Sequence, residues 1–497
     1  MVYFLDKFLK KEIFIMVKKI SIKKAKNRIY IIILSTLIFS IITFSIGCNI
    51  EQQLFKIPEK IKEVVTIKSD INISPINDVI DSIEKEYLYD IKREELITSA
   101  FEGIIKSTDE KYPELLSEHD KDELEKIKDK YPEGSLDSIK ELIRKLREKK
   151  DVIKMEDLII YGNESMIKSL GDKYAYFFYP ENYRIMMENY SGHISGVGMY
   201  VNQVEEKIVV VKPMENTPAY RAGIKADDVI ISVDGQSIEG KNIDEVVALI
   251  RGKTGTKVTI TFFRPETNEK FTKELIREEI EIPNLIIEIL NNKIGHVRYI
   301  GFIEGGANRL KNELEELSDQ GIEALILDLR GNTGGLLLDA VNLGQLFIDR
   351  GNIVIVKEKT DTITYRGKDT PYAQFPLVVI VDKWSASASE IFAGAMQDHN
   401  RAKLVGNTTF GKGKVQKIFS LSDGSAIKFT TGNYYLPSER SIEEIGITPD
   451  IIIDDNSETD EDEQLEIAKK IALELINEVK SSSSLQAWPL FSNIWNE

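Results

Sequence analysis

Residues 406–416, GNTTFGKGKVQ, contain a lysine, Lys412, in a pattern that fits two kinds of chemistry. The first seven residues satisfy G-x-x-x-x-G-K, the glycine-rich loop that cradles phosphate groups. That loop also requires a Ser or Thr after the lysine and then a helix, whose N-terminal N–H groups hold the anion. Here Gly413 follows Lys412, and the next residues alternate like a β-hairpin with a turn at 422–424. The sequence therefore argues against a nucleotide site and leaves Lys412 for proton transfer.

A nucleophile for such a proton transfer lies upstream, in WSASASEIFAGAMQDHN at 384–400. Small residues open a helix directly after the buried strand PLVVIVD, and such a turn presents a hydroxyl beside N–H groups that can stabilise an oxyanion. A serine needs an adjacent base. His399 would stand roughly 18 Å from Ser387 along a continuous helix, whereas Lys412 returns on the next strand. Because burial lowers the pKa of a lysine, a Ser/Lys pair is the chemistry that these residues favour.

The elements that must position this pair predict an α/β multidomain protein. Over 276–455, continuous apolar strands such as EALILDLRG and PLVVIVD alternate with helices, which is typical of a largely parallel sheet covered on both faces. Residues 192–275 form short alternating strands with glycine-rich turns and one amphipathic helix, which indicates an independent β-rich module. Residues 51–190 are mostly helical and charged, and 456–497 are an acidic linker with a final helix and tail.

Three segments carry a family resemblance: DLRGNTGG (328–335), the stretch 385–416 and the stretch 423–451. In order and spacing they resemble the C-terminal processing peptidases, the PDZ-containing serine peptidases. The resemblance implies a crotonase-like α/β protease core with an inserted PDZ domain, and no cofactor. It places the nucleophile on Ser387, the general base on Lys412 and a third catalytic residue on Gln416. Positions 412 and 416 share a face of an extended strand, so Gln416 can orient the lysine amine.

The resemblance also implies an oxyanion hole of backbone N–H groups. The matching positions are Ala388 and a glycine of GNTGG, either Gly334 or Gly335. Thr333 replaces the proline that is usual in the family, and we expect this change to be tolerated because the role belongs to the backbone. Ser385 and Ser389 are interpreted as capping or packing residues, Asp328 and Arg330 as an ion pair, and His399 as structural. His193 and His296 lie far from any set with metal-ligand spacing, so no metal site is predicted.

The β-rich module resembles a PDZ domain, with SGVGMYV as the carboxylate-binding loop and its adjoining strand. Successive N–H groups there can hold a terminal carboxylate, and the exposed strand edge can accept a peptide by β-addition. The loop donors are Gly196, Val197, Gly198 and Met199, and the facing helix offers Val246, Val247 and Ile250. Arg251 either couples this site to the active site or is an ordinary favourable partner of the helix dipole.

The start of the chain predicts a membrane tether. Residues 1–30 contain nine Lys/Arg and two Asp/Glu, and the net charge of −16 leaves −23 for the remainder, which argues against nucleic acid as the main partner. The uncharged run Ile29–Ile46 follows, with the basic segment before it and the acidic body after it, so the body is expected outside the cytoplasm, on the periplasmic or cell-surface side. Cys48, in FSIGC, resembles a lipoprotein processing site, and an uncleaved anchor is the alternative. Residues 1–50 are therefore interpreted as a signal or anchor segment.

These features together predict a membrane-tethered serine endopeptidase that recognises protein substrates by their C-termini. Two alternatives come from other classes: a catalytically silent PDZ adaptor that binds C-terminal tails, and an acyl-CoA enzyme, which the extracytoplasmic location disfavours. Roughly fifty additional charged residues at 106–160 depart from the family pattern. They could hold an adaptor partner, mediate homo-oligomerisation or extend the helical scaffold, and the sequence leaves these three open.

Overall fold

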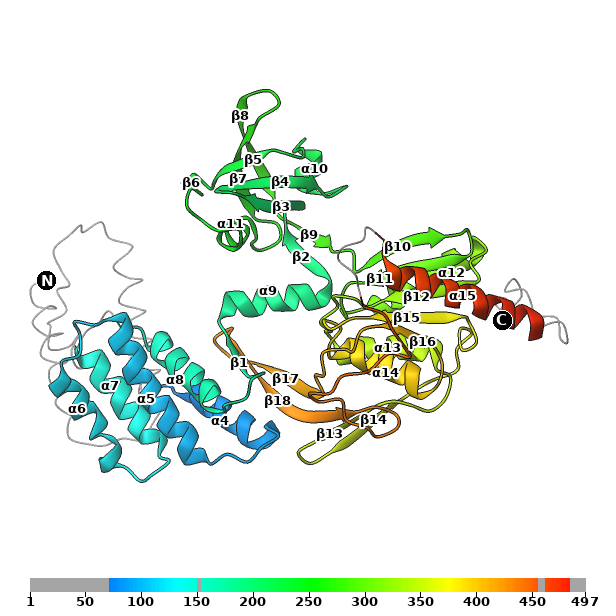
Figure 1. The fold of residues 1–497 in the computed structure, drawn as a ribbon. Helices are drawn as coiled ribbons and strands as arrows, with labels where there is room; N and C mark the ends of the chain where they lie inside the picture. Colours follow the sequence, from blue (N-terminus) through cyan, green and yellow to red (C-terminus); the bar gives the residue numbers. More distant parts are fainter. Residues whose placement is uncertain (1–70, 150–152, 455–460, 483–497) are drawn as a thin grey trace, which may run out of the picture. The chain divides into compact units, whose positions relative to one another are not determined.

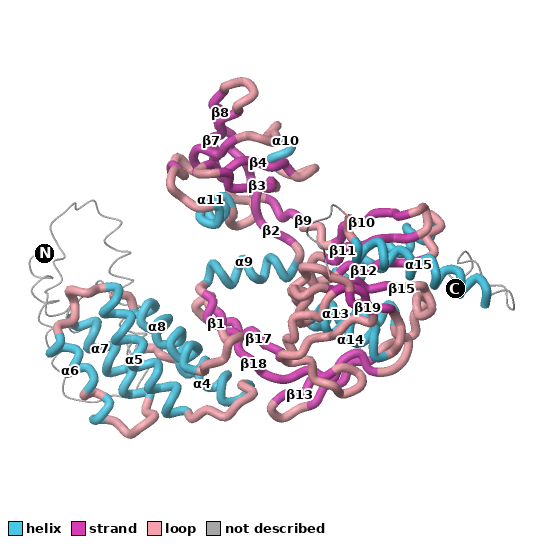
Figure 2. The backbone as a smooth tube through the Cα atoms, in the orientation of Figure 1, coloured by secondary structure: helices cyan, strands magenta, loops and turns pink. Residues whose placement is uncertain are grey.

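The computed structural model describes residues 71–149, 153–454 and 461–482. Within these ranges a helical region, a β-rich module and an α/β core follow one another in the predicted order (Figure 1). Figure 2 shows how helix dominates the first region and strand the second. The predicted anchor Ile29–Ile46 and Cys48 lie outside the described residues. No helix of the described ranges has the length and apolar character that crossing a bilayer requires.

The helical region is built from amphipathic helices whose apolar positions recur at helical spacing. In α7, Ile139, Leu142, Ile143 and Leu146 are all buried while the charged residues between them face outward. The start of α6 is closed by a capping box in which Ser117 and Asp120 exchange side-chain and backbone hydrogen bonds. The elements are α4 (Ser74–Glu86), α5 (Arg93–Lys111), α6 (Glu118–Glu125), the 3-10 helix η1 (Lys128–Lys130), α7 (Leu136–Lys149), α8 (Met155–Ser169), β1 (Tyr176–Phe178) and α9 (Pro180–Ser191).

The core of this helical region continues onto a sheet of the α/β core. Phe177 of β1, and Ile427 and Phe429 of β18 (Ala426–Tyr435), belong to the same apolar cluster as the buried residues of α4 to α8. The charged residues 106–160 contribute α6 and α7 to that cluster. Residues 106–160 therefore extend the helical scaffold. The other two roles, binding of an adaptor partner and homo-oligomerisation through this segment, stay predictions.

The β-rich module is a six-stranded antiparallel sheet with its own apolar core. Its sheet begins at Met199, because residues 193–196 pair instead with 278–281 as a separate two-stranded ribbon. Asp228 is fully buried and forms a bidentate pair with Arg264, which ties β5 to β7. The elements are β2 (His193–Gly196), β3 (Met199–Val204), β4 (Lys207–Pro213), α10 (Pro218–Arg221), β5 (Val229–Val233), β6 (Gln236–Ser237), α11 (Ile243–Ile250), β7 (Lys257–Arg264), β8 (Glu269–Ile276) and β9 (Glu278–Glu281).

The α/β core contains the largely parallel sheet that the apolar runs predict. Its order is β10-β11-β12-β15-β16-β19, and every neighbouring pair after β10 is parallel. The strands are β10 (Leu285–Leu290), β11 (Ile294–Tyr299), β12 (Ala324–Asp328), β15 (Leu377–Val381), β16 (Lys403–Gly406) and β19 (Ile451–Ile452). The helices are α12 (Gly306–Asp319), α13 (Leu337–Phe347), α14 (Ala388–Asp398) and α15 (Glu463–Ser482).

Helices cover both faces of this sheet. Alternate residues of each strand fall into two clusters: Leu325 and Leu327 pack with α12, α13 and α14, whereas Ile326 packs with α15. Because successive strand side chains point to opposite faces, fully buried strands need apolar residues at every position. This requirement explains the continuous runs ALILD and LVVIV.

A second sheet carries the residues after Lys412. The predicted hairpin is confirmed: β17 (Lys414–Ser420) pairs with β18, and the Asp423 carboxylate accepts from the Ser425 N–H in the turn. Strand β18 also pairs with β1 and with β13 (Asn352–Glu358), which in turn pairs with β14 (Thr362–Arg366). The hairpin is thereby held between the helical region and the α/β core.

Candidate active site

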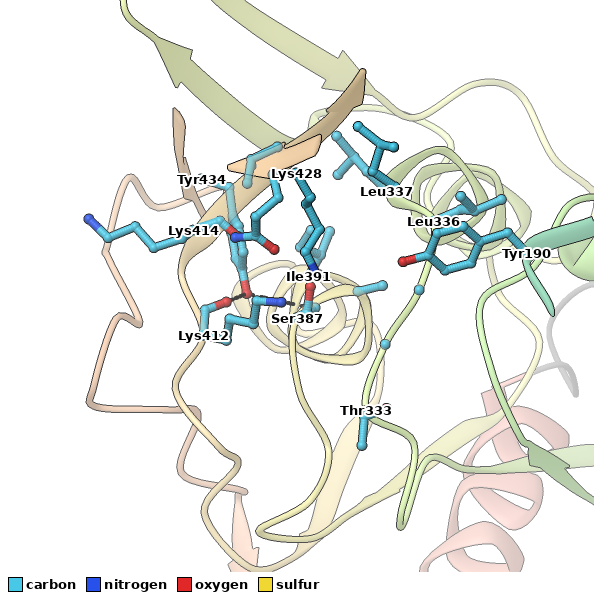
Figure 3. A pocket seen from close by; sticks show the side chains of 16 residues that line it. Tyr190, Thr333, Leu336, Leu337, Ser387, Ile391, Lys412, Lys414, Lys428 and Tyr434 are labelled. Carbon is cyan, nitrogen blue, oxygen red and sulfur yellow. Dashed lines mark hydrogen bonds between the residues drawn. The ribbon is translucent and has the colours of Figure 1, made fainter. Parts of the chain in front are cut away.

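A cavity of about 290 Å³ lies where the loops that follow β12 and β15 meet the hairpin (Figure 3). In parallel sheets such loops at the carboxyl ends of strands commonly form ligand sites. All six residues that the sequence predicts for catalysis and the oxyanion hole line this one cavity: Ser387, Ala388, Lys412, Gln416, Gly334 and Gly335. The structure therefore brings together residues that lie up to 82 positions apart in the chain.

Ser387 stands at the turn that begins α14, in an uncommon backbone conformation. Its φ of 56° and ψ of −113° place a non-glycine residue in a strained region, at a cost of roughly 1–3 kcal/mol. The neighbouring serines face elsewhere: the Ser385 hydroxyl donates to the Leu329 carbonyl and the Ser389 hydroxyl donates to the Asn332 carbonyl, both at 2.8 Å and fully buried. They are packing residues, as predicted, and of the three serines Ser387 is the one on the cavity.

The carboxylate of Glu390 joins the serine turn to the lysine loop. Glu390 is fully buried, and its Oε2 accepts from the backbone N–H groups of Ser387 at 2.8 Å and Lys412 at 2.9 Å. Its Oε1 accepts from the Thr409 hydroxyl at 2.6 Å and the Gly411 N–H at 2.7 Å. A buried carboxylate is stable only when such donors surround it, so this residue fixes one loop against the other.

Lys412 presents its amine to the same cavity, directed toward Ser387 (Figure 3). Burial lowers the pKa of this amine below its usual value, and the charge of Lys428 lowers it further. Three carboxylates act in the opposite direction: Glu443, Glu390 and Asp172. The ring of Tyr174 lies 4.9 Å from Nζ. No hydrogen bond directly joins the Lys412 amine to the Ser387 hydroxyl.

Gln416 lies in the cavity, but not on a continuous strand with Lys412. Strand β17 begins at Lys414, and its pairing with β18 shifts register between Val415 and Gln416. The Gln416 Nε2 donates to the Lys414 carbonyl at 3.0 Å, and no hydrogen bond connects it to Lys412. The extra residue at this irregularity is Thr431 of β18, and Lys412 and Gln416 line the same cavity, so the orienting contact between them stays a prediction.

The predicted oxyanion donors differ in whether their N–H groups are free. The Gly334 N–H donates to the Asn332 side chain at 2.9 Å. Phe302 and Gly335 form a short parallel bridge, in which the Phe302 N–H donates to the Gly334 carbonyl and the Leu336 N–H donates to the Phe302 carbonyl. The Gly335 N–H takes no part in this bridge and points away from it. Within the described residues the Gly335 and Ala388 N–H groups have no acceptor. Of the two candidate glycines, Gly335 is therefore the one with an available donor.

Two other contacts hold the loops around the cavity. The Tyr434 hydroxyl donates to the Lys412 carbonyl and lies 3.3 Å from the Ser387 carbonyl. The predicted ion pair is present: the Arg330 guanidinium binds the buried Asp328 and also Asp462, just before α15.

His399 ends α14, and its ring nitrogen contacts the Asn352 carbonyl at 2.7 Å, which is a structural position. No group of three or more His, Cys, Asp or Glu in the described ranges could hold a metal ion.

In the β-rich module, the predicted carboxylate loop lies between β2 and β3. The carbonyls of Val197 and Gly198 accept backbone hydrogen bonds from Ala219 and Met214, while the N–H groups of Val197 and Gly198 have no acceptor within the described residues. Gly196 ends β2, and Met199 begins β3, which is an edge strand of the module sheet.

Helix α11 packs against β3 and β5, but its predicted pocket residues are not equivalent. Val246 is fully buried and Ile250 nearly so, and both belong to the module core, whereas Val247 keeps exposed surface. The 3.6-residue period turns positions 246 and 250 inward. Arg251 is the residue that caps the C-terminus of α11.

Four residues of the site were not identified from the sequence: Glu390, Asn332, Tyr174 and Lys428. Glu390 carries a local signal, because a Glu three residues after a Ser at a helix start is a capping-box pattern. Tyr174 lies in the loop before β1, and its ring reaches the Lys412 amine from a segment distant in the chain. Nothing local distinguishes Lys428 from the other lysines of the hairpin.

Comparisons with known proteins match two segments of the chain to family models. Residues 293–453 match the model of Peptidase family S41, and residues 209–264 match that of a PDZ domain. A carboxyl-terminal-processing protease of Picosynechococcus sp. is 35% identical over 311 residues, which cover 61% of this chain and 75% of that protein. A "Probable CtpA-like serine protease" of Staphylococcus aureus (strain COL) is 37% identical over 318 residues, 62% of either chain.

The chain thus spans less than two thirds of the length of the S. aureus relative. Among solved structures, the photosystem II D1 C-terminal processing protease aligns with a TM-score of 0.42 at 25% identity, covering 78% of this chain and 94% of that one.

Proposed function

The chain belongs to peptidase family S41, with the carboxyl-terminal-processing proteases among its relatives, and we propose that it is a serine endopeptidase that cleaves protein substrates selected by their C-termini. The observation that carries this proposal is the single cavity in which the strained Ser387 turn meets the half-buried amine of Lys412. A hydroxyl and a desolvated amine in one cavity are the minimum that a serine nucleophile with a lysine base requires.

In the proposed reaction the Ser387 oxygen attacks a substrate carbonyl carbon while the neutral Lys412 amine takes the hydroxyl proton. The tetrahedral intermediate expels the amine of the departing segment, to which Lys412 returns the proton, and an acyl-enzyme remains on Ser387. Water then attacks the ester by the same proton route in reverse and releases the acid. No step calls for a cofactor.

The oxyanion of the intermediate is proposed to sit against the N–H groups of Ala388 and Gly335. Two arguments support this pair: both groups lack an acceptor within the described residues, and both line the cavity beside Ser387. Donors already fixed in the fold need no reorganisation as charge develops, which is why such groups contribute strongly to catalysis. Gln416 is proposed to orient the Lys412 amine through its side-chain oxygen, after substrate binding.

Substrate selection is assigned to the PDZ module. We propose that the loop donors Gly196 to Met199 hold the terminal carboxylate and that the substrate tail adds to the free edge of β3. Val247 offers an exposed apolar contact from α11, while Val246 and Ile250 stabilise the helix from within. Arg251 is a candidate for coupling an occupied module to the protease core.

The proposed place of action is outside the cytoplasm, with residues 1–50 as the tether. The support is the basic start followed by the uncharged run Ile29–Ile46, with Cys48 two residues beyond it. A Cys48→Ser protein separates the two forms of tether: loss of membrane association indicates a lipid on Cys48, and retention indicates an uncleaved anchor.

The activity is tested with a folded substrate protein that ends in an apolar tail, offered as the free acid and as the C-terminal amide. Wild-type protein should shorten the substrate with the free acid, and it should shorten the C-terminal amide more slowly. The Ser387→Ala variant should cleave neither substrate. A catalytically silent PDZ adaptor would bind the free acid and leave it intact. Comparison of C-termini in cells with wild-type protein or a Lys412→Ala variant then identifies the natural substrates.

A further inference from the structure

A second lysine enters the active-site cavity beside Lys412. Lys428 lies on β18, opposite Ile418 of β17 on one side and Tyr176 of β1 on the other, and its side chain lines the cavity with Ser387. Figure 3 shows this side chain descending from the strand, with its amine directed toward Ser387. Two lysines from separate segments, the 407–413 loop and β18, therefore converge on one serine.

The Lys428 amine is half-buried and has no polar partner among the described residues. No ion pair or hydrogen bond engages it, and its Nζ lies over the face of the Phe178 ring, 5.5 Å from the ring centroid. The other lysines of the hairpin differ: Lys414 donates to Asn433 and Tyr89, and Lys417 pairs with Glu358 at 2.8 Å and Glu86 at 3.2 Å. A half-buried cation without a polar partner still loses part of its hydration with nothing to replace it, so a structural role alone does not account for Lys428.

The charges around Lys412 explain what an unpaired cation does there. Carboxylates approach Lys412 from three elements, namely Glu390 on α14, Glu443 after β18 and Asp172 before β1, and each favours the protonated amine. The Tyr174 ring 4.9 Å from Nζ also favours a cation. The charge of Lys428 acts against these groups and lowers the pKa of Lys412. Burial lowers the pKa of Lys428 itself, and Asp172 acts in the opposite direction by stabilising its charge.

We propose that Lys428 is a positioning residue for catalysis, whose positive charge keeps the neighbouring Lys412 amine neutral and able to accept the Ser387 proton. This inference rests on the proposed endopeptidase function. Like charges in one cavity disfavour each other, so a charged Lys428 opposes protonation of Lys412. The same repulsion acts in the second half of the reaction, because it favours passing the proton from Lys412 to the departing amine.

The test compares the pH dependence of kcat/KM in wild-type protein and in Lys428→Met, which keeps the length of the side chain and removes its charge. Without Lys428 the proton on Lys412 is held more firmly, so the acid limb of the profile should move to higher pH. At a fixed pH on the acid side of the profile, kcat/KM of Lys428→Met should be about tenfold lower than wild type for each pH unit by which the acid limb has moved. At high pH, where Lys412 is neutral in both proteins, kcat/KM of the variant should reach the wild-type plateau. Lys428→Arg, which keeps a positive charge, should restore the wild-type limb.

Lys417→Met is the matched control, because it removes an ion-paired lysine from the adjacent strand and should leave the limb in place. Labelling of Ser387 by a small fluorophosphonate at each pH repeats the measurement without a peptide substrate, and thermal unfolding shows whether each variant is folded. A Lys428→Met profile that superimposes on wild type overturns the inference. A loss that is equal at all pH values also overturns it, since that result indicates a direct or purely structural role. If wild-type protein itself shows no Ser387-dependent hydrolysis, it is the proposed function that fails.

Discussion

Glu390 provides the sharpest test of how the site is held, because one buried carboxylate anchors both loops. The substitution Glu390→Gln keeps the size of the side chain and replaces one acceptor oxygen by an NH₂ group. Each oxygen of Glu390 now accepts from at least one backbone N–H: Ser387 and Lys412 on one side, Gly411 on the other. In either orientation the new NH₂ must therefore face a donor.

The magnitude follows from these contacts. One or two hydrogen bonds to a charged acceptor are lost and leave a buried donor unpaired, at about 2–4 kcal/mol in the free energy of unfolding. For a domain of the size of the protease core this corresponds to a fall in Tm of about 4–16 °C. A displacement of about 1 Å between Ser387 and Lys412 should also lower kcat/KM by about 10²-fold.

The assay pairs thermal unfolding by circular dichroism with kcat/KM on a peptide that has a free C-terminus. Glu316→Gln, on the exposed face of α12, is the control for loss of one negative charge and should leave both quantities unchanged. A Glu390→Gln protein with wild-type kcat/KM and Tm would refute the view that this carboxylate positions the two loops.

Three further substitutions test other parts of the account. Gly334→Ala adds a Cβ 2.7 Å from the Ala386 carbonyl oxygen and 2.9 Å from the Ser387 Cβ, at a φ of +102°. Because this displaces the Ser387 turn, kcat/KM should fall by at least about 10²-fold. A kcat/KM near the wild-type value would show that the 331–335 loop moves enough to accommodate the methyl group. Lys412→Met should lower kcat/KM by about 10²–10⁴-fold. Because burial lowers the pKa of Lys412 in the folded state, the variant should also be the more stable at neutral pH, and the difference measured by urea unfolding should shrink as pH rises toward the ordinary lysine pKa. Asp228→Asn removes the buried partner of Arg264 and should destabilise the PDZ module by about 3–5 kcal/mol, seen as earlier proteolysis of the module, while fluorophosphonate labelling of Ser387 persists.

Much of the arrangement follows from local patterns that the fold does not override. The apolar runs ALILD and LVVIV predict a parallel sheet, and the alternation after Lys412 predicts the hairpin, because both signals depend on burial at fixed spacing. The choice of Ser387 over Ser385 and Ser389 came from the family resemblance. The structure adds a physical reason, since the outer two hydroxyls are held by the Asn332 and Leu329 carbonyls.

The remaining features depend on contacts between distant segments, which no local pattern records. The register shift between Val415 and Gln416, where Thr431 of β18 is the extra residue, is one such feature. Tyr174 reaches Lys412 from 238 residues away. Lys428 of β18 and Lys417 of β17 face opposite sides of the hairpin, and Lys417 has the ion pairs that Lys428 lacks. Val246 looked available for a peptide pocket because helix periodicity alone does not say which apolar stripe the module core takes.

The central claim, that Ser387 is a nucleophile activated by Lys412, is tested most directly by locating the adduct of a small fluorophosphonate. Intact-mass analysis followed by peptide mapping should find one label, on Ser387, formed faster as pH rises and lost in Lys412→Met. A label on Ser385 or Ser389, or labelling of Ser387 at the same rate in Lys412→Met, would contradict the account.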